Sequence, residues 1–431
     1  MIYMNSRRYF IGSMVKGGTA VAALGLGAAD AFAGSGLAGN LLPQFDPTGS
    51  EEDFWIQVQQ AYTVNPNIIN LNNGGVSPAP KIAQDALRRF NDMANEGPSY
   101  YMWRIMDQGR EPLRQNLARL AGCDAEEIAI DRNATEALNT VIFGLPLQRG
   151  DEVIGTLQDY PNMIQAWKQR QMRDGIVYKQ ISFNFPIENE DTMVRAFEQA
   201  ITPKTKLLHL THIINWVGQI LPVQKIADMA HARGIEVLVD GAHSFGLLDF
   251  KIPDLHCDYF GTSLHKFLSA PIGSGMLWIK KDKIANVWPL VCNDKPLSDN
   301  IRKFETLGTR SFCIEQAIGA SIHFHEAIGA RRKQDRIHFL KHYWASRAMQ
   351  IPKVKLHTSL DPKFSCAIAG VSVDGMTPGE LDQKLFNEYK IHTVSIVWEN
   401  ISCVRITPHV YTRLQDLDKL VGALETISRK V

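Results

Sequence analysis

Short apolar runs alternate with amphipathic stretches through the centre of the chain, from about residue 110 to residue 291. Runs rich in Val, Ile and Leu predict strands at 127–130, 152–156, 206–211, 236–239, 259–262 and 275–279. Apolar positions at helical spacing predict helices between several of them, such as 135–143 and 223–233. This alternation indicates an α/β fold with a mainly parallel sheet covered on both faces. Ligands of such sheets bind beyond the carboxyl ends of the strands.

The pattern changes near residue 308 and predicts a second, smaller domain. A helical stretch runs to about residue 349, and further strands are predicted at 367–373 and 403–407. We therefore expect a large domain at 91–310, followed at 311–431 by a connecting helix and a small α+β domain. An N-terminal segment precedes them at 34–90, and its first part is rich in Gly, Pro and Leu, as is typical of a linker.

Residues 1–33 have the form of a twin-arginine export signal. Arg7 and Arg8 lie in the run Ser-Arg-Arg-Tyr-Phe-Ile, and a Gly- and Ala-rich apolar stretch follows at 12–29. Ala31 and Ala33 form a small-x-small cleavage site, after which Gly34 begins the mature protein. The alternative is a membrane anchor or a disordered tail, but the stretch is short and weakly apolar for a spanning helix. The signal predicts a periplasmic protein, exported after folding by the twin-arginine machinery, without stable membrane insertion.

Composition and charge exclude several classes of partner. Hydrophobic residues make up 45% and charged residues 21% of the 431-residue chain, which is ordinary for a globular protein. The formal net charge is +1 and basic residues form no block, so nucleic acid is not an expected partner. The six cysteines form no CxxC pair and the 13 histidines no HExxH motif, so no metal site is indicated. The spacing of the cysteines leaves open whether any of them form disulfides.

One aspartate and one lysine lie just after predicted strands and suit the chemistry of one cofactor. Asp240 ends the apolar strand at 236–239, and Lys266 follows the strand at 259–262. Pyridoxal phosphate requires such a pair, because an amine forms its Schiff base and a carboxylate keeps its pyridine nitrogen protonated. The alternative for Lys266 is a solvated surface lysine, which its apolar neighbours Phe260 and Phe267 disfavour.

Further polar residues follow predicted strands in positions suited to the same cofactor. The helix that begins after Asn133 offers free N–H groups and the Thr135 hydroxyl to a phosphate, although an N-cap role explains both residues equally well. Tyr160 follows another strand and offers a ring for stacking, although a core or turn role is commoner. Asn215 follows a third strand, where it is either a hydrogen-bond donor to the ring hydroxyl or a polar turn residue.

Two other groups of candidates lie near the lysine and in the small domain. Ser263 and His265 flank Lys266, where they could reach the phosphate. Arg405 lies between apolar residues on a predicted strand, and a guanidinium fork is the natural ligand of a substrate carboxylate. A surface salt bridge is the alternative role for this arginine. Thr309 lies at the end of the predicted large domain.

In this order, the residues resemble the class V aminotransferase family of fold-type I pyridoxal phosphate enzymes. The resemblance extends from the Leu-Asn-Asn-Gly-Gly run at 71–75 to Arg405. The family includes cysteine desulfurases and isopenicillin N epimerase-like proteins. Membership implies an α/β large domain around a seven-stranded, mainly parallel sheet, a smaller C-terminal α+β domain, and a homodimer with active sites at the interface.

The resemblance also implies a role for each candidate. Lys266 forms the internal aldimine, Asp240 pairs with the pyridine nitrogen, and His243 lies near the ring hydroxyl. The residues that bind the phosphate are Ala134, Thr135, Ser263 and His265. The remaining cofactor contacts are Tyr160 on the ring, Asn215 at the ring hydroxyl and substrate, and Thr309 at the phosphate of the neighbouring subunit. The substrate-binding residues are Arg405 for the carboxylate, with Asn72 and Asn73 lining the pocket.

The sequence departs from one branch of this family. Cysteine desulfurases carry a nucleophilic cysteine on a loop just before the strand of the carboxylate-binding arginine, and residues 392–400 contain none. Cys403 lies in the arginine strand and is expected to point elsewhere, and Cys366 falls too early. Tyr160, where many members have histidine, is more like the epimerase branch. Together with the export signal, this core is similar to periplasmic pyridoxal phosphate enzymes that tailor siderophore peptides of the pyoverdine type.

We therefore predict a homodimeric enzyme that acts on an amino acid or an amino-acid-like group. Lys266, once displaced by the substrate amine, is the general base for the Cα proton, and Asp240 keeps the ring electron-poor so that it accepts the carbanion. Transamination or a related side-chain modification is favoured over epimerisation. The rivals are a C–S lyase that needs no cysteine and a non-catalytic protein that uses the same fold for binding.

Overall fold

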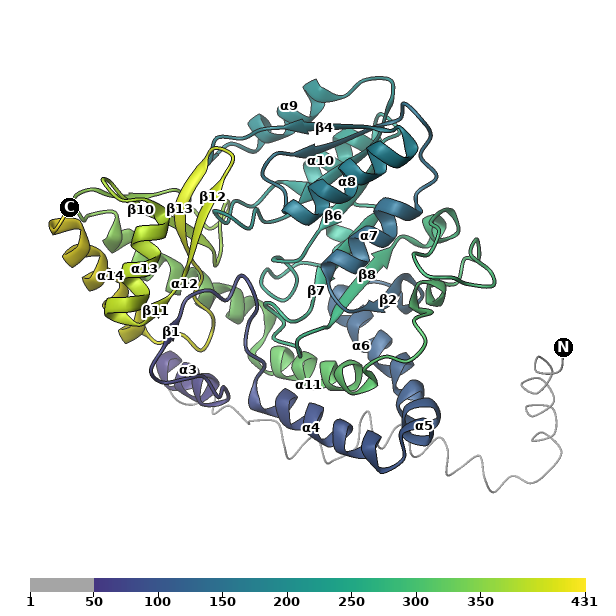
Figure 1. The fold of residues 1–431 in the computed structure, drawn as a ribbon, viewed down its shortest axis with the longest axis horizontal. Helices are drawn as coiled ribbons and strands as arrows, with labels where there is room; N and C mark the ends of the chain where they lie inside the picture. The colour runs from purple at the N-terminus through teal and green to yellow at the C-terminus, as the bar shows by residue number, and fades with distance from the viewer. Residues whose placement is uncertain (1–49) are drawn as a thin grey trace.

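The structure is a computed structural model, and it describes residues 50–431 of the chain. The predicted signal peptide and most of the predicted linker lie outside these residues. Figure 1 shows a large domain at the right and a smaller one, which contains the C-terminus, at the left. Among the described helices, none is both long enough and apolar enough to cross a membrane.

The large domain is built on a seven-stranded sheet in the order β2-β8-β7-β6-β5-β3-β4. Its strands are β2 (Ile128–Asp131), β3 (Glu152–Thr156), β4 (Val177–Ile181), β5 (Thr205–Thr211), β6 (Glu236–Asp240), β7 (Tyr259–Ser263) and β8 (Gly275–Ile279). The pairs from β4 to β7 are parallel, and β8 is antiparallel to both of its neighbours. The predicted strands agree with these bounds to within a residue or so. The half-exposed edge strand β4 was not predicted, because its mixed polar sequence lacks an apolar run.

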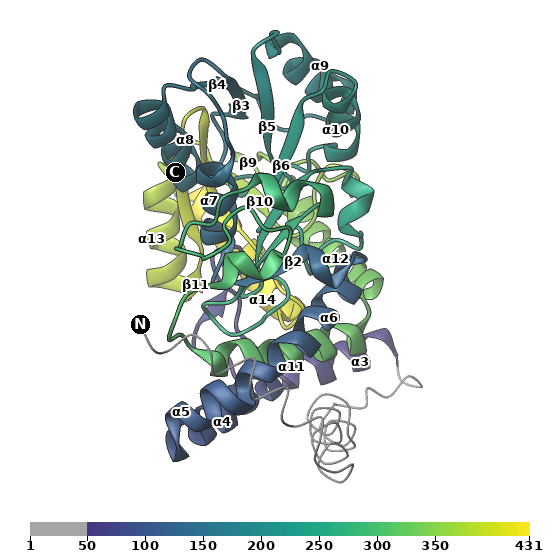
Figure 2. The same ribbon diagram turned by 90° about the vertical axis from the view of Figure 1, so that its right-hand side faces the viewer.

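Helices bury both faces of this sheet, as Figure 2 shows on either side of strands β3 to β6. One face packs against α7 (Ala134–Gly144) and α8 (Pro161–Asp174). The other face packs against α6 (Arg110–Ala121), α9 (Glu190–Ala200), α10 (Val223–His231) and α11 (Phe312–Ile328). A sheet covered in this way exposes its functional groups at strand ends, so the carboxyl ends of β5, β6 and β7 are where a site can form.

The small domain is an antiparallel sheet covered by helices. Its strands, in the order β12-β13-β10-β9, are β9 (Val354–Leu356), β10 (Ala369–Val373), β12 (Val394–Trp398) and β13 (Ile401–Ile406). Its helices are α12 (Ala330–Ala348), α13 (Pro378–Tyr389) and α14 (Leu414–Arg429). The single helical stretch predicted from residue 308 to residue 349 is two helices, α11 and α12, because Gly329 breaks it with a φ of 91°.

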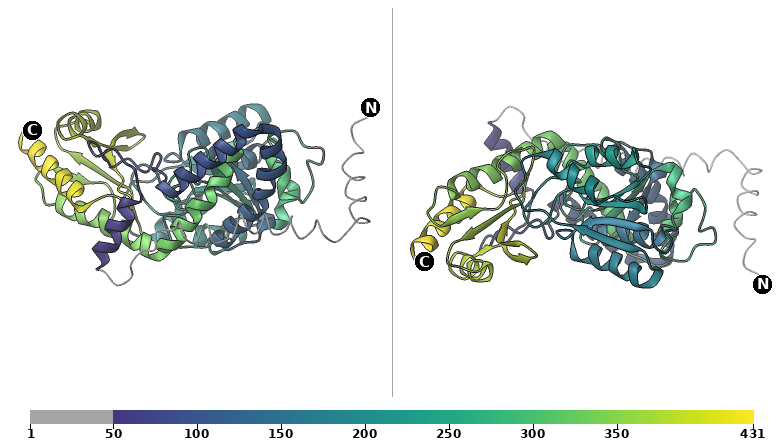
Figure 3. Two further views of the ribbon diagram at one scale, coloured as in Figure 1. Left: turned by 90° about the horizontal axis from the view of Figure 1, so that it is seen from below. Right: turned by 90° about the horizontal axis from the view of Figure 1, so that it is seen from above.

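The N-terminal segment joins the two domains rather than hanging free. Helix α3 (Glu51–Gln60) buries Phe54, Trp55 and Val58 against the helix α11 side of the core. Strand β1 (Ile69–Asn70) pairs with β11 (Ile391–His392) of the small domain. Helix α4 (Lys81–Glu96) then returns to the large domain and lies along α11, as the left view in Figure 3, seen from below, shows. The segment between β1 and α4 is thereby held at the domain boundary, close to the carboxyl ends of the central strands.

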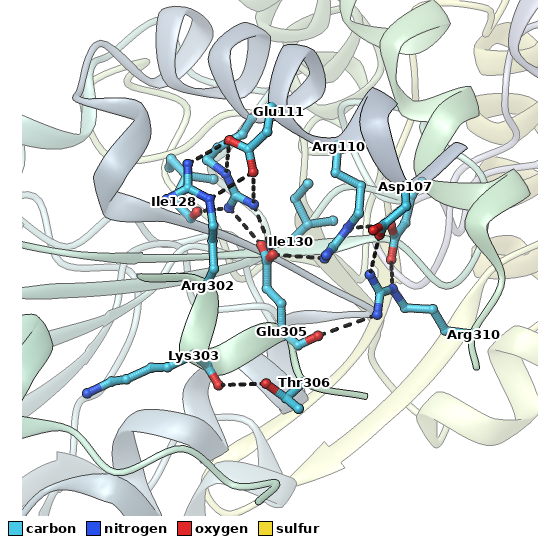
Figure 4. Close-up of polar contacts among 12 residues, drawn as sticks. Asp107, Arg110, Glu111, Ile128, Ile130, Arg302, Lys303, Glu305, Thr306 and Arg310 are labelled. Carbon is cyan, nitrogen blue, oxygen red and sulfur yellow. Dashed lines mark hydrogen bonds and ion pairs between the residues drawn. The ribbon is translucent and has the colours of Figure 1, made fainter. Parts of the chain in front are cut away.

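A buried ion-pair network fixes the connection between the large domain and α11 (Figure 4). Glu305 accepts a hydrogen bond from the Ile130 N–H at 2.7 Å and pairs with Arg114 at 2.7 Å and Arg110 at 2.9 Å. Glu315 of α11 pairs in turn with Arg110 and with Arg310 at 2.7 Å. Because these charges are buried, each depends on its partners to offset its lost hydration.

Candidate active site

Asp240 lies at the carboxyl end of β6, in the middle of the sheet. Its carboxylate is buried, with 5% exposure, and Oδ1 accepts a hydrogen bond of 2.9 Å from the Ala242 N–H. Burial raises the pKa of this carboxyl, an effect that the Ala242 N–H and the nearby Lys266 amine oppose. A cation placed against Asp240 would therefore be bound strongly and would hold the carboxylate ionised.

Lys266 follows β7, the strand next to Asp240, and its side chain turns into the space between the domains. The residue as a whole is partly exposed, whereas its amine lies deep enough that burial lowers its pKa to about 8. The Asp240 carboxylate acts to raise this pKa and the Arg405 guanidinium to lower it. A lysine with such a pKa supplies a neutral, nucleophilic amine at mildly alkaline pH.

His243 connects this lysine to the N-terminal segment. Its Nε2 atom lies 2.8 Å from the Gly74 carbonyl oxygen and 3.3 Å from Lys266 Nζ. Because a carbonyl only accepts hydrogen bonds, the proton of the neutral imidazole is on Nε2 and points at Gly74. With its proton committed to Gly74, Nε2 offers no acceptor to a Lys266 ammonium, which favours the uncharged amine. Burial lowers the pKa of His243 well below its ordinary value, so the ring is neutral.

The predicted phosphate-binding residues meet at the start of α7. Asn133 caps the helix by accepting from the Glu136 N–H, and the hydroxyl of Ser263 accepts a 2.9 Å hydrogen bond from the Ala134 N–H. The hydroxyl proton of Ser263 is thus directed away from the helix and is available to an anion. Thr135 lies in the first turn of the same helix, where the helix dipole favours negative charge.

Two details of β8 and its loop support this arrangement. A Cβ added to Gly275 would lie 2.5 Å from the Asn133 backbone nitrogen, so glycine is needed for the helix start to approach the sheet. His265 Nδ1 lies 3.0 Å from the Ser274 carbonyl oxygen. This contact places a proton on Nδ1 and leaves Nε2 of His265 as the free ring nitrogen.

Arg405 faces this space from β13 of the small domain. It donates from one terminal nitrogen to the Asn215 carbonyl and from the other to Asn72 Oδ1, each at 2.9 Å. Burial lowers its pKa to about 10, and no carboxylate pairs with it among the described residues. Its Nε and the side-chain oxygen of Asn215 are buried without a hydrogen-bond partner in the described chain. Buried polar atoms without a hydrogen-bond partner destabilise the fold unless a ligand supplies the missing hydrogen bond.

The other predicted residues lie in more varied positions. Asn73 is fully buried, and its amide is occupied by Tyr411, Asn70 and the Thr407 carbonyl, so it braces the segment and has no group left for a substrate. Tyr160 is 41% exposed at the start of α8. Thr309 is exposed on the loop before α11. The stacking role of Tyr160 and the intersubunit role of Thr309 stay predictions.

Cys403, which is expected to point elsewhere than the site, shares a strand face with Arg405. The two residues are two positions apart in β13, so their side chains face the same side, and each affects the pKa of the other. Cys403 is nevertheless completely buried, and burial raises the pKa of its thiol to about 12. A thiol with this pKa is a poor nucleophile, and the expectation that Cys403 is not a desulfurase cysteine stays a prediction.

Two features of the site escaped the sequence analysis. The rings of Trp216 and Trp398 stack with centroids 5.6 Å apart, which joins the loop after β5 to the small domain beside Asn215. The carboxylate of Asp159 accepts hydrogen bonds of 2.8 Å from Thr156 and Thr211 beside Asp240. The Trp216–Trp398 stacking and the Thr211–Asp159 hydrogen bond join segments far apart in the chain, so the local sequence does not signal them.

Comparisons with known proteins identify the family. The sequence profile described as Aminotransferase class-V matches residues 69–420. Isopenicillin N epimerase from Streptomyces clavuligerus is 26% identical over 393 residues, which cover 87% of this chain and 98% of that protein. A probable cysteine desulfurase from Synechocystis sp. is 28% identical over 329 residues, covering 72% of this chain and 77% of that protein. The chain belongs to the class-V aminotransferase family, which confirms the predicted resemblance.

The solved structures agree with this assignment. The cystine C–S lyase C-DES, in complex with its reaction product cysteine persulfide, is similar with a TM-score of 0.77 at 25% identity. The match covers 84% of this chain and 98% of that chain. The predicted fold, an α/β fold-type I large domain with a mainly parallel sheet and a smaller C-terminal α+β domain, is confirmed.

The residues of the site fit pyridoxal phosphate. Asp240 offers a buried carboxylate to a pyridinium nitrogen, and Lys266 offers an amine to the aldehyde. The start of α7 with Ser263 offers donors to the phosphate, and Asn215, whose backbone carbonyl accepts from Arg405, has a buried side-chain oxygen without a partner in the described chain. Among residues 50–431, no group of His, Cys, Asp and Glu side chains could hold a metal ion.

Proposed function

We propose that this protein is an enzyme that uses pyridoxal phosphate to convert the amine-bearing carbon of an amino acid or an amino-acid-like group. The observation that supports this most is the position of Lys266. Its buried amine lies within electrostatic reach of both the Asp240 carboxylate and the Arg405 guanidinium. An amino acid bound with its carboxylate on Arg405 would thus place its amine and Cα next to Lys266 and Asp240.

Each residue has a distinct task in this proposal. Pyridoxal phosphate, when bound, supplies an electron sink for the Cα carbanion. Asp240, held by the Ala242 N–H, keeps the sink protonated. Lys266 Nζ, uncharged in its buried setting, takes the Cα proton and returns it. Arg405, fixed by Asn72 and Asn215, orients the substrate through its carboxylate.

For the reaction itself we propose transamination or a related side-chain modification. Transamination requires one group that moves a proton between Cα and the cofactor along one face of the cofactor ring. Lys266 is a buried amine suited to that task. The test is an absorbance spectrum of the purified protein before and after a panel of amino acids and peptide-derived amines. Conversion of a yellow bound cofactor to the pyridoxamine form by one donor supports transamination. A wild-type protein that stays colourless with added pyridoxal phosphate would refute the whole proposal.

Epimerisation and elimination are second candidates, which the relatives favour. The match to isopenicillin N epimerase covers 87% of this chain, and the similar solved structure is a cystine C–S lyase. A cofactor that binds amines without conversion, together with incorporation of solvent deuterium at Cα and loss of optical activity, would indicate epimerisation. Release of a sulfur product from cystine would indicate a lyase. A Lys266→Ala protein that keeps its cellular role would instead indicate a binding protein.

We also propose a homodimer and export to the periplasm. Exposed aromatic side chains in the described chain include Tyr100 at 59%, Trp103 at 41% and Trp288 at 48%, which suits an interface between copies. Analytical ultracentrifugation would detect the dimer, and a monomer at micromolar concentration would contradict it. Export is supported by the Arg7–Arg8 pair, and cell fractionation of wild type and of Arg7→Lys, Arg8→Lys protein tests it.

A further inference from the structure

His209 lies on β5, the strand next to the one that ends in Asp240. In the parallel pairing of β5 and β6, His209 is opposite Leu238 and Thr211 is opposite Asp240. Residues paired in this way face the same side of a sheet, and so do residues two apart in one strand. His209 and Asp240 are therefore diagonal neighbours on one face, which α8 covers.

Trp167 of α8 fixes the tautomer of this histidine. Its indole Nε1 lies 3.1 Å from His209 Nδ1, and the two rings meet edge to face at 88°. An indole N–H only donates, so Nδ1 accepts and the proton of the neutral imidazole is on Nε2. Both side chains have no exposed surface. Trp167 is itself held by a stacking contact with Tyr178 of β4.

The Nε2–H group of His209 is buried without a hydrogen-bond partner among the described residues. An orphan donor in a protein interior is costly and calls for an explanation. The Asp240 carboxylate interacts electrostatically with this histidine, which acts to lower the pKa of Asp240. Burial lowers the pKa of His209 to about 4, so at neutral pH it acts as a dipole and not as a charge.

We propose that His209 is a positioning residue that directs its Nε2–H dipole at Asp240, with Trp167 fixing the tautomer, and so strengthens the pairing of Asp240 with the cofactor's ring nitrogen. This rests on the proposed function, since it assumes a pyridine nitrogen at Asp240. The other titratable groups that act on Asp240 are Asp159, which raises its pKa, and Lys266, which lowers it. His209 therefore opposes the unfavourable effect of burial and of Asp159 without contacting the substrate.

The first test compares pyridoxal phosphate with its carbocyclic analogue, in which a C–H group replaces the ring nitrogen. His209→Phe should weaken binding of pyridoxal phosphate about tenfold or more and leave binding of the analogue unchanged. His209→Gln, whose amide N–H can take the place of Nε2–H, should restore most of the loss. Equal weakening of both ligands, or of neither, would overturn the proposal, because a merely structural role does not distinguish a nitrogen from a C–H.

The second test uses the protein without cofactor, so that it is independent of the proposed function. Nitrogen NMR should show His209 protonated at Nε2 and not at Nδ1 in the wild type. Asp240→Asn should shift the Nε2 resonance, and Trp167→Phe should allow the other tautomer to appear. An Nδ1–H tautomer in the wild type, or an Nε2 resonance indifferent to Asp240→Asn, would overturn the inference. A wild type that passes this test and yet binds no pyridoxal phosphate would refute only the proposed function.

Discussion

His243 Nε2 lies 3.3 Å from Lys266 Nζ and 2.8 Å from the Gly74 carbonyl oxygen, so the proton that it donates to Gly74 leaves no acceptor for the lysine. Since the carbonyl requires the N–H, the lysine amine is disfavoured as a cation. The N-terminal segment that carries Gly74 thus contributes to the reactivity of a lysine that is distant from it in the sequence. Burial of the same amine acts in the same direction.

The rate at which the cofactor-free protein captures pyridoxal phosphate should rise with pH through a midpoint near 8. The pKa of Lys266 is lowered to about 8, and only the uncharged amine above that pH is nucleophilic. An unperturbed lysine would instead have its midpoint near pH ~10.4. Stopped-flow absorbance from pH 6 to pH 10 measures this. Arg405→Gln should raise the midpoint, because the guanidinium lowers the lysine pKa, and Asp240→Asn should lower it. Midpoints that do not move would contradict this account.

Arg405→Gln should weaken binding of the amino-acid substrate roughly thirtyfold or more, because a buried charge pair is worth about 2 kcal/mol or more. The matched ligand is the amine that lacks the carboxylate, whose affinity should be the same in wild type and variant. The matched variant is Arg195→Gln, since Arg195 is exposed on α9 and should have no effect. An equal loss for both ligands would show that Arg405 supports the fold and does not bind the carboxylate.

Gly275→Ala should weaken cofactor binding and lower the melting temperature. The new Cβ would lie 2.5 Å from the backbone of Asn133 and would push the start of α7 away from the sheet. Gly422→Ala is the control, because its Cβ meets nothing within 4 Å in helix α14, where alanine stabilises a helix by about 1 kcal/mol relative to glycine. Calorimetry and a cofactor titration measure both effects. A Gly275→Ala protein with unchanged affinity would show that the approach of α7 is not needed.

Glu305→Gln should lower the free energy of unfolding by about 3–5 kcal/mol, because it removes the buried carboxylate that Arg114 and Arg110 share. Glu126→Gln removes an exposed partner of Arg302 and should cost about 0–1 kcal/mol. Urea denaturation of both variants checks this difference. If the two costs were equal, the network of Figure 4 would be no more than a set of surface pairs.

The amino-acid sequence by itself determined the alternation of strands and helices, and with it the sheet and the strand ends at which Asp240 and Lys266 lie. Apolar runs and turn residues are local properties, so their pattern is readable without a structure. Edge strand β4 was not predicted, because this half-exposed strand has no apolar run. The single predicted helix from residue 308 to residue 349 failed because the break at Gly329 depends on one backbone angle.

The tertiary structure alone decided which side chains face one another. It placed the Asn73 amide in a buried set of hydrogen bonds, put Cys403 on the same face as Arg405, and brought His209 onto the same sheet face as Asp240. Each result depends on register and on contacts between segments far apart in the chain, and a local sequence pattern does not specify these. Burial, which sets the pKa of Lys266 and of Asp240, is likewise a property of the packed molecule.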